Sequence, residues 1–186
     1  MMFGWGPSAE AKPIVFALCL LITGIATITD WRKGVIPNWL TLPPLFLGPV
    51  AYGIAAGAGG LVGSLAAIAV VSAVPLLMWY RDGMAGGDLK LFAALGAMMG
   101  LDLALQAELL SFVVGALYAM GRLTWDGKLA RTLGNAMYVG LNPVLPQRLR
   151  KEMSTELQQT LRLGGAIFAG TLITILGDMR PAWLGF

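Results

Sequence analysis

The segment PIVFALCLLITGIATIT occupies residues 13–29 and contains no charged side chain. A helix of about 17–25 mostly apolar residues is long enough to cross the hydrocarbon core of a bilayer. Five further apolar stretches follow, over about 39–57, 60–79, 88–103, 105–121 and 162–179, with a tight turn expected at about 101–107. Membrane β-strands would alternate apolar and polar residues, whereas these stretches are continuously apolar. The sequence therefore predicts an all-α, polytopic membrane protein with about six transmembrane helices.

Composition supports this fold class and excludes several classes of enzyme. The 186-residue chain is 57% hydrophobic and only 12% charged, which is too little charge to cover a soluble domain. It has no histidine, and Cys19 is its single cysteine, which we expect to be a small apolar residue of the first span. Histidine-dependent hydrolases, disulfide frameworks and four-cysteine zinc sites are therefore excluded. The net charge of +3 is too small to suggest nucleic acid, and we expect no metal and no cofactor.

Lysine and arginine residues predict the orientation of the chain. If the N-terminus lies outside the cytoplasm, all 13 basic residues except Lys12 and Arg180 lie on the cytoplasmic side, as the positive-inside rule requires. The residues before the first span include Glu10 and lack a basic cluster, so we expect a retained helix and not a cleaved signal peptide. Both termini are thus expected outside the cytoplasm. The lipid bilayer is the expected partner of the apolar spans.

The polar segment 122–161 is expected to lie on the cytoplasmic side. Apolar residues recur in it at helical spacing, at Leu129, Leu133 and Met137 and again at Leu149, Met153, Leu157 and Leu161. Prolines separate the two runs, and basic residues lie between the apolar ones. This pattern predicts two amphipathic helices on the anionic inner leaflet, with a compact cytoplasmic hairpin as the alternative. We treat 1–186 as a single transmembrane domain that includes this segment.

Two acidic residues lie at the cytoplasmic ends of apolar spans. Asp30 ends the first span, and Asp88 begins the fourth. Each has a structural explanation, since Asp30 could pair with Arg32 or Lys33, and Asp88 after two glycines is a good helix N-cap. The chemical alternative is that two carboxylates held close cannot both ionise, so one serves as general acid while the other activates water. Such a pair can hydrolyse a bond without histidine or metal. A third acid, Asp82, is expected to be a solvated loop residue.

The motifs around these acids resemble those of type IV prepilin peptidases. DWRKGVIPN at 30–38 resembles the family segment Asp-x-Arg-x-x-x-Ile-Pro-Asn, and GGDLKLFAALG at 86–96 resembles Gly-x-Gly-Asp-x-Lys followed by apolar residues. RLGGAIFAG at 162–170 is similar to the small-residue terminal helix of the family. Ala85 replaces the first glycine of the family pattern, and Gly86 at the variable position can supply backbone freedom.

This resemblance implies an aspartyl membrane peptidase with Asp30 and Asp88 as catalytic residues. It also implies that Gly86 and Gly87 let the substrate backbone approach, with Lys90 as a further substrate contact. The short chain and the missing four-cysteine region are most similar to the small branch that serves Flp/Tad-type pili. The implied activity is removal of the short basic leader of a prepilin at the cytoplasmic face of the bacterial inner membrane, with pilus-assembly proteins as candidate partners.

Two other function classes remain open. A transporter or assembly subunit would use acids at the membrane edge to carry protons or ions. A lipid-phosphate hydrolase would use them to bind Mg²⁺, with Arg32, Lys33 and Lys90 as phosphate ligands. Processing of a prepilin separates the first alternative from the peptidase, and metal dependence separates the second.

Reporter fusions test the predicted orientation. We expect fusions at about residues 35, 84 and 140 to report the cytoplasm and a C-terminal fusion to report the outer side, because of the uneven distribution of lysine and arginine. A cytoplasmic C-terminus would show that the number of spans is wrong, most directly within 88–121.

Overall fold

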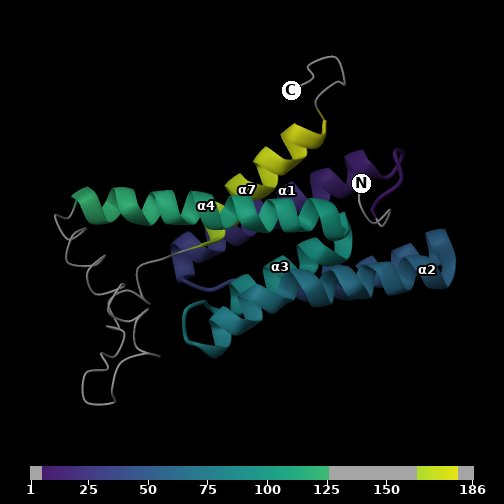
Figure 1. Cartoon of the computed structure of the whole chain (residues 1–186), viewed down its shortest axis with the longest axis horizontal. Coiled ribbons are helices and arrows are strands. Elements are labelled where there is room, and N and C mark those ends of the chain that lie inside the picture. Colours follow the sequence, from purple (N-terminus) through teal and green to yellow (C-terminus); the bar gives the residue numbers. More distant parts are fainter. Residues whose placement is uncertain (1–5, 126–162, 180–186) are drawn as a thin grey trace, which may run out of the picture. The chain divides into compact units, whose positions relative to one another are not determined.

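The computed structural model describes residues 6–125 and 163–179, which form helices joined by short turns, with no strand among them (Figure 1). In chain order these are α1 (Lys12–Lys33), α2 (Asn38–Tyr80), α3 (Gly86–Met99), α4 (Leu101–Trp125) and α7 (Gly164–Asp178). The all-α prediction is confirmed for these residues. Of the predicted amphipathic segment 122–161, only 122–125 are described, as the end of α4, and the remainder lies outside the described residues.

The chain divides into two compact units. The first comprises Met1–Val114 with Arg162–Phe186, and the second comprises Gly115–Leu161. The described part of the second unit is the C-terminal part of α4. All contacts discussed below lie within the first unit. A single domain over 1–186 stays a prediction.

Several helices have the length and composition of membrane spans. Among the described residues, Lys12–Lys33, Asn38–Tyr80 and Leu101–Arg122 are long and apolar enough to cross a bilayer, and α7 is a shorter apolar helix. Large apolar side chains are exposed along them, such as Ile14 of α1 and Ile54 of α2. A soluble protein rarely tolerates such surfaces, whereas lipid favours them. The chain is therefore a membrane protein, and the number of six spans stays a prediction.

The long helix α2 contains a sharp reversal. Ala56 and Gly57 have non-helical backbone angles, and Gly57 has φ 65°, which favours glycine. Gly60 lies so close to Tyr52 that a Cβ atom there would overlap the Tyr52 carbonyl oxygen. In a straight helix these residues would be about 12 Å apart. The two halves of α2 therefore correspond to the separate stretches predicted at 39–57 and 60–79.

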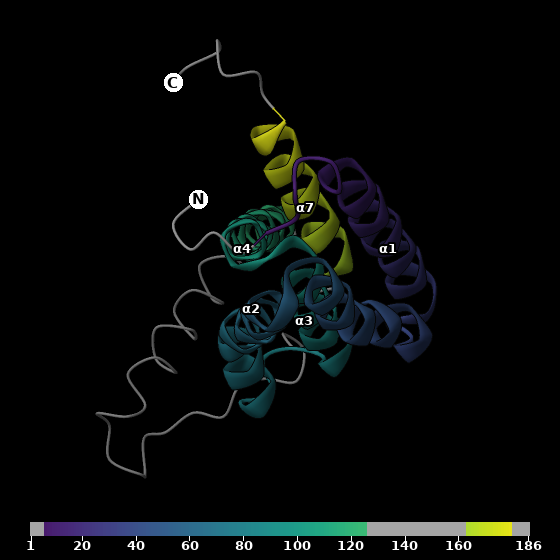
Figure 2. The ribbon, with the colours of Figure 1, turned by 90° about the vertical axis from the view of Figure 1, so that its right-hand side faces the viewer.

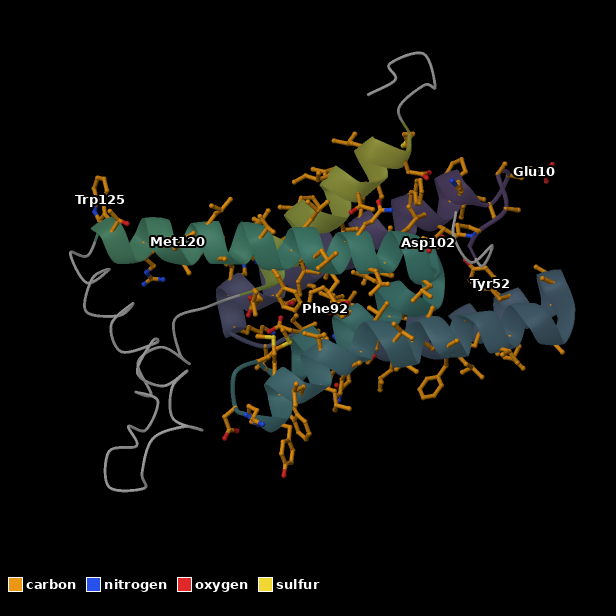
Figure 3. The ribbon with its side chains drawn as sticks, in the orientation of Figure 1. Glu10, Tyr52, Phe92, Asp102, Met120 and Trp125 are labelled. Carbon is orange, nitrogen blue, oxygen red and sulfur yellow. The ribbon has the colours of Figure 1, made fainter. Side chains whose placement is uncertain are left out.

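The central helix of the first unit is α3. It packs mainly against α2 (Figure 2), and its Leu91, Phe92 and Leu95 are almost completely buried. Phe92, which is labelled in Figure 3, also contacts Phe112 of α4, and their ring centroids are 5.6 Å apart. With 14 residues, α3 is about 21 Å long, which is shorter than a hydrocarbon core of about 30 Å. Burial within the protein therefore accounts for its apolar sequence.

The boundary between α3 and α4 differs from the expected turn at 101–107. The break lies at Gly100, whose φ of 78° and ψ of 175° suit glycine, and α4 begins at Leu101. Asp102 lies in the first turn of α4, where the helix dipole favours an acid, and Glu108 is buried within the helix. The predicted span 88–103 is therefore too long, because Gly100 marks its end.

The helices α1 and α7 lie side by side and antiparallel (Figure 2). At one end, Lys12 Nζ and Asp178 Oδ2 form an ion pair at 2.7 Å. At the other end, the Thr27 hydroxyl of α1 donates to the carbonyl oxygen of Gly164 at 2.9 Å. Cys19 of α1 has no exposed surface, as expected of a small apolar residue. This pairing brings the start of α7 to the end of α1.

The tight contact between α2 and α3 predicts that Gly48→Ala destabilises the protein. A Cβ atom at Gly48 would lie 2.6 Å from the Ala97 carbonyl oxygen and 2.9 Å from the Ala97 Cβ. Overpacking of this kind costs about 1–3 kcal/mol. We expect a lower unfolding temperature in detergent for this variant. Gly59→Ala is the matched control, since nothing lies within 4 Å of its Cβ position, and equal destabilisation by both changes would contradict the packing.

Candidate active site

Asp30 and Asp88 come from different helices and line one cavity. Asp30 lies in the last turn of α1, and Asp88 lies in the first turn of α3. The cavity has a volume of about 300 Å³. Its lining comprises the two acids together with Gly34, Val35, Ile36, Asn38, Ala85, Gly86, Gly87 and Lys90. The segments that sequence reasoning singled out on either side of the two acids thus meet around a common space.

The end of α1 positions Asp30. Gly34 adopts φ 67° and its N–H bonds the Asp30 carbonyl oxygen at 2.9 Å, which ends the helix in a left-handed turn. The Asp30 side chain is buried, and its Oδ2 accepts a hydrogen bond from the backbone N–H of Gly164 at 3.1 Å. Arg32 and Lys33 are exposed. The bond that Asp30 makes is therefore to the start of α7, and not to the basic neighbours that the structural alternative invoked.

The interpretation of Asp88 as a helix N-cap is wrong. Ala85 is the N-cap, with no side-chain capping bond, so Asp88 is the third residue of α3. Its side chain is nevertheless only 5% exposed. The helix α3 is not among the candidate spans. Burial and, after it, the charge of Asp30 raise the pKa of Asp88 to about 7. Burying a carboxyl group is costly, and capping does not explain why it is placed here.

The glycines before Asp88 allow close packing. A Cβ atom at Gly87 would lie 3.0 Å from the Ile36 Cβ, and one at Gly86 would lie 3.4 Å from the Trp79 indole nitrogen. The backbone of Ala85 is extended, with φ −73° and ψ 144°, and neither glycine has a positive φ. Ala85 therefore fits in place of the family glycine without help from Gly86, because no left-handed backbone is needed here.

Lys90 and Asn38 form a polar pair on the cavity wall. The Lys90 ammonium donates to Asn38 Oδ1 at 2.9 Å. Sequence reasoning did not single out Asn38 or Gly164, although Asn38 closes the DWRKGVIPN segment and Gly164 lies in RLGGAIFAG. Their roles depend on contacts between distant segments. Within 6–125 and 163–179, no three His, Cys, Asp or Glu side chains converge as metal ligands, and the lack of a cofactor stays a prediction.

Comparison with known proteins agrees with the resemblance. The sequence model of the type IV leader peptidase family matches residues 14–120. A prepilin leader peptidase/N-methyltransferase of Burkholderia pseudomallei (strain 1026b) is 35% identical over 138 residues, covering 67% of this chain and 41% of the relative. The protein of the same name from Bacillus subtilis (strain 168) is 32% identical over 133 residues, covering 68% and 50%.

The matches cover most of this chain but only part of each relative. The chain spans about half or less of the length of the relatives that it matches. It has no significant match among solved structures. The family match, however, covers more than half of the chain and includes both cavity acids. The chain therefore belongs to the type IV leader peptidase family.

Proposed function

We propose that this chain is a membrane-embedded aspartyl endopeptidase that removes the short basic leader of type IV, Flp-type prepilins. The observation that carries the proposal is that two carboxyl groups, Asp30 and Asp88, are buried on one cavity. Neither capping nor an ion pair accounts for them among the described residues. Membership of the leader peptidase family supports the same activity.

The two carboxyl groups suit hydrolysis by a shared-proton pair. The ionised carboxylate takes a proton from water, and the water oxygen attacks the carbonyl carbon of the scissile peptide. The protonated carboxyl group donates to the carbonyl oxygen. When the C–N bond breaks, the proton taken from water passes to the leaving nitrogen, and the second carboxyl group recovers its proton from a hydroxyl of the intermediate. Each step uses groups that Asp30 and Asp88 provide.

The proposed position in the cell follows from the distribution of charge. By the positive-inside rule we expect the cavity end of α1, with Arg32 and Lys33, at the cytoplasmic face, and membership of the leader peptidase family supports the bacterial inner membrane. A prepilin with a basic leader in the cytoplasm and an apolar helix in the bilayer would present its cleavage site at this level. We propose that Gly86, Gly87 and Lys90 contact this substrate. We propose pilus-assembly proteins as further partners, and we propose no nucleic-acid partner.

Substitution of either acid should abolish processing. We expect Asp30→Asn and Asp88→Asn each to lower the cleavage rate by about two orders of magnitude or more, because general acid–base catalysis contributes on that scale. Cleavage is measured as loss of the leader from a co-expressed Flp-type prepilin, with the amount of inserted peptidase measured in parallel.

Asp82→Asn is the matched control for these changes. Asp82 is exposed and has φ 56°, a left-handed conformation that asparagine also adopts. Activity close to wild type is expected. An essential Asp82 together with a dispensable Asp30 would contradict the assignment.

The pH dependence in the presence of EDTA tests the aspartyl mechanism. The raised pKa of Asp88, about 7, means that the pair keeps its last proton up to near-neutral pH and loses it above. Cleavage of a synthetic prepilin by purified protein should therefore fall as the pH rises through about 7. The cleavage rate should also fall at low pH, where the base becomes protonated. The result is a bell-shaped pH profile whose two apparent pKa values describe the pair of carboxyl groups and not either residue alone.

The same series separates the peptidase from a metal-dependent hydrolase. Peptidase activity should persist in EDTA across the bell, whereas an enzyme that holds Mg²⁺ between these acids would lose activity and regain it on adding the metal. Strict metal dependence of the wild-type protein would overturn the aspartyl mechanism.

A further inference from the structure

The first backbone N–H of α7 is directed at Asp30. Gly164 begins α7, and its N–H donates to Asp30 Oδ2 at 3.1 Å in a buried hydrogen bond. The first N–H groups of a helix have no partner within it and carry its partial positive charge. A hydrogen bond of this kind favours the ionised form of a carboxyl group.

Contacts between α1 and α7 fix this geometry. The Thr27 hydroxyl, one turn before Asp30 on α1, shares its proton between the carbonyl oxygen of Gly164 at 2.9 Å and that of Thr23 in its own helix at 2.8 Å. A Cβ atom at Gly164 would lie 3.0 Å from both the Cβ and Oδ2 of Asp30. Only a residue without a side chain lets the N–H approach this closely without displacing the carboxylate. The glycine and the threonine bond therefore act together on the position of Asp30.

The surroundings of the two carboxyl groups differ. Within the described part of the chain, no hydrogen bond reaches the Asp88 side chain, whereas Asp30 accepts one from Gly164. Of the charged groups near Asp30, Asp88 shares its cavity and the Lys90 ammonium bonds Asn38. Among the described residues, the other charged side chains close to Asp30 on α1 are Arg32 and Lys33, which are exposed. Lys12 and Asp178 pair at the opposite ends of α1 and α7, away from Asp30. Gly164 is thus what distinguishes Asp30 from Asp88.

We propose that Gly164 is a positioning residue that holds Asp30 ionised, so that Asp30 is the base and Asp88 carries the shared proton. This assignment rests on the proposed peptidase function. Asp30 takes the proton from the attacking water, and Asp88 protonates the carbonyl oxygen. As the C–N bond breaks, Asp30 returns its proton to the leaving nitrogen, and Asp88 recovers one from a hydroxyl of the intermediate.

Two substitutions of Gly164 separate the effect of losing its N–H from the effect of crowding Asp30. Gly164→Pro removes the N–H at the first position of a helix, where proline is common. Gly164→Ala adds a Cβ atom but keeps the N–H. Both variants should turn over more slowly, because both crowd Asp30. Only Gly164→Pro should move the acid limb of the pH profile upward, by about one pH unit, the scale of one charge-assisted hydrogen bond.

The limb that moves decides the assignment. If Asp88 were the base, losing the N–H would move the alkaline limb upward and leave the acid limb in place. That result, or an unchanged profile in Gly164→Pro, would overturn the proposal. An equal shift of the acid limb in Gly164→Ala would also overturn it, since crowding alone would then explain the effect.

A second measurement keeps Gly164 intact. Leu163 has helical backbone angles, φ −79° and ψ −15°, and a proline after it disfavours them. Folding of Gly164→Pro is therefore at risk, and this measurement does not depend on it. Infrared titration of Asp88→Asn, taken as the difference from the Asp30→Asn/Asp88→Asn double variant, isolates Asp30 from the other acids of the chain, and the same difference for Asp30→Asn isolates Asp88. Asp30 should ionise at a lower pH than Asp88, and the reverse order or equal values would overturn the proposal.

These titrations need no turnover, so they remain informative if the proposed function is wrong. Absence of prepilin cleavage by the wild-type protein would remove the peptidase function. The order of ionisation would still show which of the two carboxyl groups holds the charge.

Discussion

A bilayer offers no water to polar groups, so carboxyl groups in this chain have to be accommodated by the protein itself. The accommodation occurs where the end of α1 meets the beginnings of α3 and α7. Helix ends carry backbone groups without partners, and these are the polar contacts that an otherwise apolar chain has to offer. Asp30 uses one of them, the N–H of Gly164. The cavity with Asp30 and Asp88 lies at these helix ends, where such contacts are available.

Close backbone approach is the second requirement, and glycine meets it at several places. Gly87 lets the first turn of α3 reach Ile36, and Gly164 lets α7 reach Asp30. Farther from the cavity, Gly48 allows α2 to touch Ala97 of α3, so that α3 is held from end to end. These residues have ordinary helical or extended backbones. Their value here lies in the absence of a side chain and not in conformational freedom.

Much of this arrangement could be predicted from the sequence, because lipid imposes a simple rule on composition. Uninterrupted apolar runs identified the helices, and the two acids at the ends of runs identified the cavity. The capping alternative at Asp88 arose because two glycines are poor helix formers and suggested a later start of the helix. Burial of α3 outweighs that preference, so the helix begins at Gly86. The bond from Gly164 to Asp30 could not be predicted, since it joins segments that only the folded chain brings together.

The burial of Cys19 has a practical consequence for spectroscopy. Its side chain has no exposed surface, and it is the single thiol of the chain. Thiol reagents applied to the folded protein should therefore not label Cys19, so the natural cysteine can stay in place. Cysteines introduced at the exposed positions Val35 and Arg81 would carry a pair of spin labels or fluorophores on segments that lead into the cavity from its two sides. The distance between the probes would then follow those segments while a substrate is bound and released.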